Sequence, residues 1–279
     1  MARTGRIKME GEAFYHVIGR IANKAFLMRN REVKEMFLKF LLKASEFSGV
    51  CVVTYIIMDN HFHLLVYVPS AAAVDDAELL RRIGVLYGRV KMENLKSRWE
   101  EIPDSVAGAE KEAYRIRMGD LSMFMKTFVQ RFTQWFNGRY KHEGGLWGGR
   151  FKSVLIESGE QLRAVVNYIH NNSVRARLTR LAGEYEWSAL RAARNGDAFA
   201  RRGLSLVGVD WRVDPVCGEC DKRLSNGKIM GSESFVKRVL NMFSASVPRS
   251  GRRRNCCFEY CGVRFTSSHG QRSAPRMAA

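Results

Sequence analysis

The sequence predicts an α+β fold with a ferredoxin-like antiparallel sheet, and three observations support that prediction. Short β-rich or apolar segments alternate with segments of helical period, in the order β-α-β-β-α-β-α. Two strand segments are adjacent, which favours a hairpin over the crossover of a parallel sheet. The chain of 279 residues is 46% hydrophobic and 27% charged, which is typical of a globular protein with a buried core. We expect the helices to cover one face of the sheet.

The first four elements each have a clear signal. A β-rich segment at 13–20 precedes a segment at 33–47, whose apolar residues recur at the three- and four-residue spacing of a helix. Two apolar runs follow, at 51–58 and 62–68. The Asp-Asn-His sequence at 59–61 separates these runs and predicts the turn of a hairpin.

The remaining elements extend the same pattern. Helical spacing returns at 74–88, and a stronger helix is predicted at 121–140. A glycine-rich basic bend at 144–150 leads into a short strand at 151–157. In the last helix, the apolar positions between 162 and 169 face the core.

Two stretches depart from this pattern. Residues 89–118 are charged, lack a clear period and contain Pro103 and Gly108, so we interpret them as an insertion or long connection. They interrupt a main domain predicted to span residues 1–199. Residues 200–279 are predicted to be a basic, cysteine-containing C-terminal extension that is partly disordered.

Charge indicates the kind of partner. The chain has 46 Lys and Arg against 28 Asp and Glu, for a formal net charge of +18. Residues 201–279 contain 15 of these basic residues and 6 of the acidic ones, with one helix predicted at 232–243 and disorder at 266–279. Such an excess favours a polyanion such as nucleic acid, because bound phosphates release counterions. An anionic membrane surface is the weaker alternative.

The sequence contains no signal for a membrane or for secretion. The uncharged run from Phe47 to Met58 has 12 residues, whereas a transmembrane helix needs roughly 18. The basic N-terminus is not followed by an apolar segment. We therefore expect a cytoplasmic, nucleoid-associated protein with no membrane partner.

The cysteines of the extension allow two interpretations. Their pairs have a spacing that could supply a structural Zn²⁺ site, and free thiols in a reducing compartment are the alternative. The four candidate zinc ligands are Cys217, Cys220, Cys257 and Cys261.

His61 and His63 are the first candidates for a metal site. Residues i and i+2 of a strand point to the same face, so the two imidazoles would lie side by side. One metal ion needs a third ligand, and a pair of surface or polar-core histidines is the alternative.

Tyr168 and Asn172 are the next candidates. Four residues apart on the last predicted helix, they lie on one side, beside the apolar ridge, where a tyrosine can be exposed to a substrate. A phenol has an ordinary pKa of about 10, so nucleophilic chemistry requires a nearby cation or a proton acceptor. The alternative is a tyrosine that flanks the core, followed by a capping asparagine.

Three linked motifs occur along the chain, namely Met-Asp-Asn-His-Phe-His-Leu-Leu-Val at 58–66, Gly-Leu-Trp-Gly-Gly-Arg-Phe-Lys at 145–152 and Tyr-Ile-His-Asn-Asn-Ser-Val-Arg-Ala at 168–176. Together they resemble the single-tyrosine HUH transposases, especially the REP-associated tyrosine transposase branch. Trp187-Ser188 matches a later motif, and the resemblance covers roughly residues 3–195. Ser173 replaces the usual proline of the third motif, and the insertion is longer than the usual connection.

The resemblance implies a bacterial, metal-dependent single-strand DNA endonuclease and strand transferase that acts in transposition and DNA recombination. His61, His63 and Asn172 would bind Mg²⁺ or Mn²⁺, whose preference for hard ligands suits an amide oxygen. Tyr168 would attack single-stranded DNA near a hairpin or repeat, giving a 5′-phosphotyrosine and a free 3′-OH. The resemblance leaves open whether the chain acts as a monomer or a homodimer.

Seven cations and one tryptophan flank these candidates and are predicted to contact DNA. Trp147 could stack on an unpaired base, and the alternative is a set of solvated basic faces with Trp147 in the core. The eight residues are Arg131, Arg139, Lys141, Trp147, Arg150, Lys152, Arg175 and Arg177.

Two rival functions keep the same fold. One is a catalytically inactive regulatory protein that binds DNA repeats. The presence of all four candidate site residues argues against it, namely His61, His63, Tyr168 and Asn172. The other is an RNA-binding protein that uses the same basic groove. Competition between DNA and RNA of one sequence separates this last rival, because the 2′-OH must be accommodated or excluded.

Overall fold

The computed structural model describes residues 7–9, 11–70, 73–215, 229–245, 258–260 and 263–265. The chain divides into two compact units, Met1–Val236 and Lys237–Ala279. The four candidate zinc ligands and the predicted disordered tail lie outside the described residues. Within the described residues, no helix is both long and apolar enough to cross a membrane.

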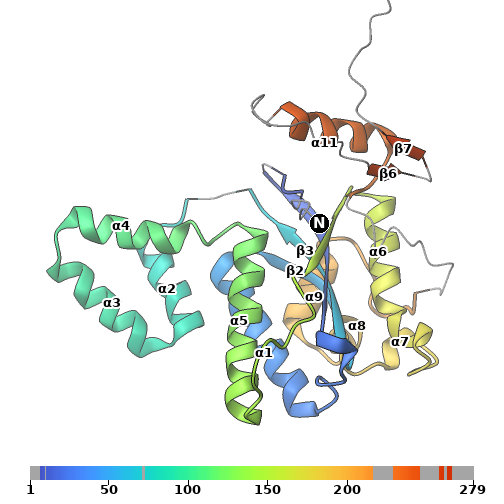
Figure 1. The fold of residues 1–279 in the computed structure, drawn as a ribbon, viewed down its shortest axis with the longest axis horizontal. Coiled ribbons are helices and arrows are strands. Elements are labelled where there is room, and N and C mark those ends of the chain that lie inside the picture. The colour runs from blue at the N-terminus through green and yellow to red at the C-terminus, as the bar shows by residue number, and fades with distance from the viewer. Residues whose placement is uncertain are drawn as a thin grey trace, which may run out of the picture. The chain divides into compact units, whose positions relative to one another are not determined.

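The first unit contains a five-stranded sheet in the order β2-β3-β1-β4-β5 (Figure 1). Its strands are β1 (Ala13–Arg20), β2 (Cys51–Ile57), β3 (His61–Val68), β4 (Lys152–Ile156) and β5 (Ile229–Met230). The pairings among β1 to β4 are antiparallel, and their order is that of a ferredoxin-like sheet. The α+β prediction is confirmed. The sheet is mixed rather than wholly antiparallel, because β5 joins the outer side of β4 in parallel.

Two long helices cover one face of this sheet. They are α1 (Arg31–Ser48), which begins where the Asn30 side chain accepts a hydrogen bond from the backbone N–H of Glu32, and α5 (Leu121–Tyr140). Phe37 of α1 lies between Phe62 of β3 and Phe128 of α5, with ring centroids 5.0 and 4.8 Å away. This aromatic cluster joins the two helices to the sheet.

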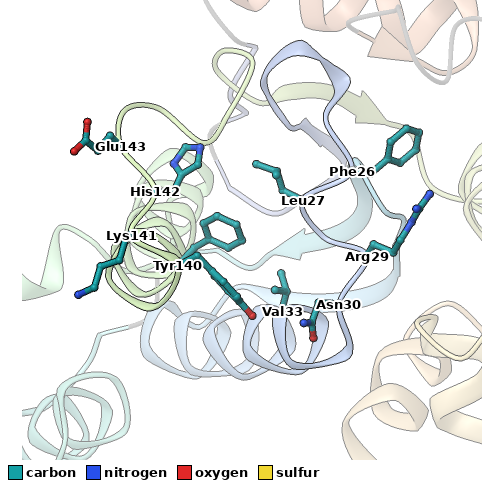
Figure 2. A pocket seen from close by; sticks show the side chains of 10 residues that line it. Phe26, Leu27, Arg29, Asn30, Val33, Tyr140, Lys141, His142 and Glu143 are labelled. Carbon is teal, nitrogen blue, oxygen red and sulfur yellow. The ribbon is translucent and has the colours of Figure 1, made fainter.

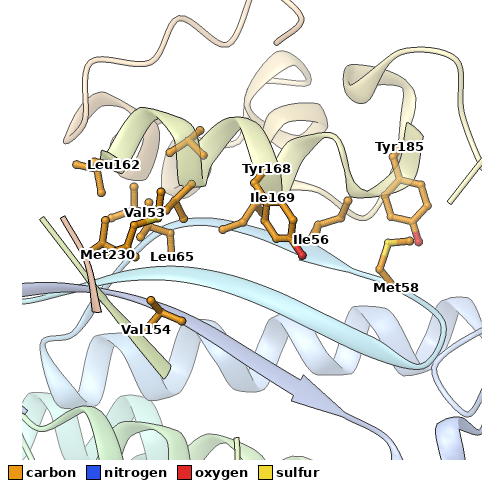
Figure 3. Close-up of a cluster of buried hydrophobic side chains, with 13 residues drawn as sticks. Val53, Ile56, Met58, Leu65, Val154, Leu162, Tyr168, Ile169, Tyr185 and Met230 are labelled. Carbon is orange, nitrogen blue, oxygen red and sulfur yellow. The ribbon is translucent and has the colours of Figure 1, made fainter. Parts of the chain in front are cut away.

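The opposite face is covered as well, so the expectation of helices on one face is wrong. Here α6 (Glu160–His170) packs its apolar ridge on side chains such as Val53 and Leu65 of the sheet (Figure 3). Side chains of a strand alternate between faces, and the fully buried Phe62 and Leu65 of β3 therefore serve different layers. A strand that is apolar on both faces needs a layer of helices on each side.

The predicted connection at 89–118 is helical, which corrects that interpretation. After α2 (Asp76–Tyr87), the chain forms α3 (Arg89–Glu101) and α4 (Asp104–Arg115), with Pro103 between them. These helices have few buried side chains, namely Leu95, Trp99 and Ala107, and these pack with α2 and with Phe47 of α1. So few buried positions leave almost no hydrophobic period in the sequence.

The outer edge of β2 is covered by the segment that follows α6. After α7 (Asn172–Arg175) and a 3₁₀ turn (Ala182–Glu184), the backbone at Ile57 bonds to Trp187 O at 2.9 Å. The chain then forms α8 (Ala189–Arg194) and α9 (Ala198–Ser205), both of which contact β2. The predicted domain boundary after residue 199 falls inside α9.

Gly203 lets α9 approach β2 closely, and Gly203→Ala is expected to destabilise the fold. A Cβ at this position would lie 2.5 Å from the carbonyl oxygens of both Val52 and Val53, so the helix or the strand must shift. Overpacking of this kind costs about 1–3 kcal/mol. Urea unfolding measures the loss, and Gly108→Ala, on an open face of α4, is the control that should not destabilise.

The second unit contains a small hairpin, β6 (Phe258–Tyr260) with β7 (Val263–Phe265), paired antiparallel. The preceding helix, α11 (Glu233–Ala245), confirms the helix predicted at 232–243.

Candidate functional site

His61 and His63 begin β3 on the face that α6 covers. Their ring centroids are 5.2 Å apart, as expected for side chains at i and i+2 of a strand. His63 is buried, with 4% of its surface exposed, and His61 is half-buried. The sequence prediction that the two imidazoles lie side by side is therefore confirmed.

Hydrogen bonds orient both rings through their Nδ1 atoms. His61 Nδ1 lies 2.7 Å from Asn60 Oδ1, and His63 Nδ1 lies 2.9 Å from Nε2 of His16 on β1. In the tautomer in which both Nδ1 atoms donate, each Nε2 keeps its lone pair, and neither Nε2 has a hydrogen bond within the described residues. His16 was not among the candidates from the sequence.

The surroundings keep both imidazoles neutral. Burial, and then the charge of Arg20, lowers the pKa of His61 to about 4, against the opposing effect of Asp59. Burial lowers the pKa of His63 well below its usual value, helped by His16 and His61. The neutral imidazole is the form that binds a metal ion.

Tyr168 lies directly against these histidines. Its ring centroid is 5.5 Å from that of His63 and 5.6 Å from that of His16, both edge to face. Figure 3 shows the side chain projecting from α6 toward the sheet. Tyr168 is 8% exposed and belongs to the apolar cluster, so the expectation of an exposed tyrosine is wrong. The packing of its ring on imidazoles from two strands accounts for the burial.

Arg175 is the cation nearest to the tyrosine ring in the described structure. Its guanidinium carbon lies 4.8 Å from the ring centroid of Tyr168, and its Nη1 donates to the Tyr168 carbonyl at 3.3 Å. The sequence predicts a role in DNA binding for Arg175, and the structure places it over the candidate nucleophile.

Asn172 does not lie on the same helix as Tyr168, which corrects the predicted element. Helix α6 ends at His170, and Asn172 is the first residue of α7. Its amide donates to the carbonyls of Tyr168 at 2.8 Å and Ile169 at 3.3 Å, as a capping residue does. No hydrogen bond joins Asn172 to either histidine in the described part of the chain, so its role as a ligand stays a prediction.

A buried pair fixes the end of α6 to the sheet. His170 Nε2 and Thr54 Oγ1 of β2 are hydrogen-bonded at 2.8 Å, two residues after Tyr168. Burial lowers the pKa of His170 to about 4, which favours the neutral ring in this position. The sequence shows His170 within the third motif but cannot show its partner on a strand 116 residues away.

A buried lysine fixes the turn that precedes His61. Lys34 Nζ of α1 lies 2.7 Å from Asp59 Oδ1 and 3.2 Å from the Tyr185 hydroxyl, which itself donates to Ile57 O at 2.9 Å. The side chain of Lys34 is 5% exposed and that of Asp59 23%, so solvent screens this ion pair little. These contacts hold the β2–β3 turn against α1.

Three of the other residues that are predicted to contact DNA instead contact protein side chains or line a cavity, away from the histidines. The Arg131 guanidinium lies 5.1 Å from the ring centroid of Tyr87, the last residue of α2. Arg139 forms an ion pair with Glu32 at 3.0 Å. Lys141 caps the C-terminus of α5 and, with Tyr140, lines an open cavity of about 930 Å³ between α5 and α1.

Figure 2 shows this cavity with Leu27 and Tyr140 turned toward it and Lys141 directed outward. The exposed Phe26 and Arg29 complete the rim, with the Arg29 guanidinium 5.1 Å from the Phe26 ring centroid. Because Glu143 also lines the cavity, its charge is mixed.

Of the remaining predicted contacts, Trp147 and Arg150 precede β4, Lys152 begins it, and Arg177 follows α7. Arg150, Lys152 and Arg177 are exposed. Trp147 is half-buried, its Nε1 donates to Thr133 at 2.8 Å, and its ring lies 5.5 Å from that of Phe62. Trp147 thus packs against the aromatic core and also lines a cavity, and its stacking on a base stays a prediction.

The donor set at the histidine pair fits a divalent ion. Two neutral imidazoles, whose Nε2 atoms have no hydrogen bond within the described residues, can each bind a divalent ion beside Tyr168. Mg²⁺ and Mn²⁺ prefer oxygen ligands, so phosphate oxygens and water would complete their coordination sphere. Within the described residues, no group of three or more His, Cys, Asp or Glu side chains could by itself hold a metal ion.

Comparison with known proteins finds similarity to solved structures but no match at the level of sequence. No protein-family model matches the sequence, and no curated protein is significantly similar to it. A REP-associated tyrosine transposase bound to a REP hairpin is 13% identical, with a TM-score of 0.49, covering 78% of this chain and 93% of that one. A candidate transposase from Deinococcus radiodurans is 15% identical, with a TM-score of 0.31, covering 61% and 97%. Both neighbours are described as transposases.

Proposed function

We propose that this protein is a metal-dependent transposase that cleaves and rejoins single-stranded DNA through Tyr168. The observation that carries the proposal is the contact of Tyr168 with His63, which places a phenol beside a pair of imidazoles suited to a metal ion. A hairpin or repeat in single-stranded DNA is the proposed substrate, with His61, His63 and Asn172 as the ligands of Mg²⁺ or Mn²⁺.

Cleavage is a transesterification at phosphorus. The Tyr168 oxygen attacks the scissile phosphate, the bond from phosphorus to the 3′ oxygen breaks, and that oxygen leaves with a proton as a 3′-OH. The phenol gives up its proton to solvent, and the product is a 5′-phosphotyrosine. A divalent ion, when bound at the histidines, supplies polarisation of the phosphate. The reverse attack by a 3′-OH rejoins the strand without an external source of energy.

Arg175 supplies positive charge to this step. Its guanidinium lies over the Tyr168 ring and stabilises the phenolate that forms as the proton leaves. The hydrogen bond between His170 and Thr54 keeps the end of α6, and with it Tyr168, against the histidine face. His170 is therefore a positioning residue rather than a group that touches the substrate.

Trapping of the covalent intermediate tests the proposal. The full chain is incubated with a pool of 5′- and 3′-labelled single-stranded hairpins and Mg²⁺ or Mn²⁺, then resolved on a denaturing gel. We expect a labelled adduct that survives denaturation, disappears with EDTA and maps to tryptic peptide 164–175, in which Tyr168 is the one tyrosine. Salt-sensitive binding without an adduct would instead favour the regulatory, non-cleaving function.

A further inference from the structure

A second cavity lies on the opposite face of the sheet from the histidines. It has a volume of about 420 Å³ and lies between α5 and the strands β1 and β3. Aromatic side chains line much of it, namely Phe62, Trp147 and Phe151. Hydrogen bonding of Trp147 to Thr133, and the contact of Phe62 with Phe37, hold two of these rings in fixed orientations.

Glycine at position 19 makes room for this aromatic wall. A Cβ on Gly19 would lie 2.2 Å from the Phe62 ring, closer than any side chain can approach. The fully buried ring therefore packs against the β1 backbone beside the cavity and supports Trp147, whose ring centroid lies 5.5 Å away. Flat aromatic faces with fixed orientation are the surfaces on which unpaired bases stack.

The rim of the cavity is positively charged. Lys126 of α5 and Arg150 are both exposed and both line the cavity, and neither has an ion-pair partner among the described residues. No Asp or Glu of the described chain lines it. The larger cavity beside α1 differs in this respect, because the acidic residue Glu143 is part of its lining.

The start of β4 connects this cavity to the histidine face. Phe151 lines the cavity, and the next residue, Lys152, pairs with Ile18 and points to the opposite face, as alternation along a strand requires. Only β1 separates β4 from β3, the strand that carries the histidines. Neighbouring strands lie about 4.8 Å apart, so the distance from β4 across β1 to β3 is roughly 10 Å. A few nucleotides can span this distance around the start of β4, because β5 pairs with β4 at Leu155 and Ile156, further along the strand.

We propose that this cavity binds one unpaired base of single-stranded DNA, which stacks on Trp147 and Phe151 while Lys126 and Arg150 contact the flanking phosphates. The proposal rests on single-stranded DNA being the substrate of the histidine site. The stacked base would fix the distance along the strand between the held nucleotide and the phosphate that Tyr168 attacks. Stacking is tolerant of base identity, so the cavity sets position rather than sequence.

Photo-crosslinking tests which residues touch the base. The probe is a single-stranded oligothymidylate of twelve nucleotides with 5-iodouracil at one position, irradiated with the full chain and digested with trypsin. We expect the crosslink in peptide 142–150, which contains Trp147 and no Phe or Tyr, or in the dipeptide 151–152. Crosslinks confined to other peptides would overturn the proposal.

Charge variants supply a second measurement that does not disturb the core. Because Lys126 and Arg150 are exposed, the double variant Lys126→Ala/Arg150→Ala should fold normally. We expect it to bind the same oligonucleotide about 5- to 100-fold more weakly, with a salt slope reduced by about 1.4, since each phosphate contact on a single strand contributes about 0.7. The matched control is Arg89→Ala/Lys96→Ala on the exposed side of α3. Equal losses in the two double variants would overturn the proposal.

The two proposals fail in different ways. A crosslink in peptide 142–150 without a covalent adduct at Tyr168 would contradict the proposed cleavage and support the base site. An adduct at Tyr168 without a crosslink in the cavity would overturn the base site alone. Absence of any binding to single-stranded DNA would overturn both.

Discussion

Tyr168→Phe is expected to abolish the covalent adduct and to lower the rate of strand cleavage by at least about 10³-fold. Removal of a covalent nucleophile costs rate factors of this size or larger, because solvent must then attack in its place. Binding of the uncleaved hairpin should change less than about twofold, since the variant keeps the aromatic ring that packs on His63 and His16. The measurement is single-turnover cleavage beside an equilibrium binding titration.

Tyr114→Phe is the matched control for this variant. Tyr114 of α4 also packs edge to face against aromatic rings, those of Trp99 in α3 and Tyr87 at the end of α2. Loss of its hydroxyl should leave the adduct intact. Cleavage that persists in Tyr168→Phe at the wild-type rate would identify a different nucleophile, and thermal unfolding of both variants checks that the fold is retained.

The arrangement of α1, β2, β3 and α5 could be predicted from the sequence because the two helices have a strong hydrophobic period and the two strands are apolar runs separated by a turn signal. The helices of the insertion, α3 and α4, could not be predicted in this way. Between them, α3 and α4 bury only a few side chains, among them Leu95 and Trp99, too few to produce a period. The parallel pairing of β5 with β4 was equally hidden, because Ile229–Met230 is two residues long and joins a strand far away in sequence.

The site shows the same division between local and long-range information. Proximity of His61 and His63 follows from the geometry of one strand, so the sequence predicts it. The burial of Tyr168 follows from packing between α6 and two strands, and the contacts of His170 and Lys34 join elements that are distant in sequence. Asn172 has the expected spacing from Tyr168, but α6 ends at His170, before Asn172. The Asn172 side-chain amide therefore donates to the carbonyl of Tyr168 near the end of α6.

His16 shows most clearly what strand pairing adds to the site. The register of β1 on β3 places Ile18 opposite His63 and His16 opposite Leu65, two residues along the same face. From there His16 Nε2 reaches His63 Nδ1 at 2.9 Å, in a fully buried position. A hydrogen bond to the second nitrogen of an imidazole fixes its tautomer and the direction of its lone pair.

His16→Ala is therefore expected to weaken Mn²⁺ binding by about 10- to 100-fold, the usual cost of removing the hydrogen-bond partner of a ligating histidine. Without His16, the His63 ring can rotate or adopt the other tautomer, and its Nε2 no longer points where a metal ion would be held. Titration calorimetry with Mn²⁺ on the full chain measures the loss directly, independently of cleavage. His16→Gln, which retains a polar group near the His63 nitrogen, should recover part of the affinity.

The control for this experiment is a histidine that is hydrogen-bonded elsewhere. His142 lies 3.2 Å from Asn137, beyond the end of α5, so His142→Ala should leave Mn²⁺ affinity unchanged. If His16→Ala binds Mn²⁺ as tightly as wild type while His63→Ala does not, the imidazole of His16 serves packing only. If neither variant changes the affinity, the metal is held away from β3, and the proposed ligand set is wrong. If both His16→Ala and His63→Ala lose Mn²⁺ affinity and His16→Gln recovers part of it, three histidines from two strands form one metal centre. In that centre His61 and His63 bind the ion, and His16 orients the ring of His63.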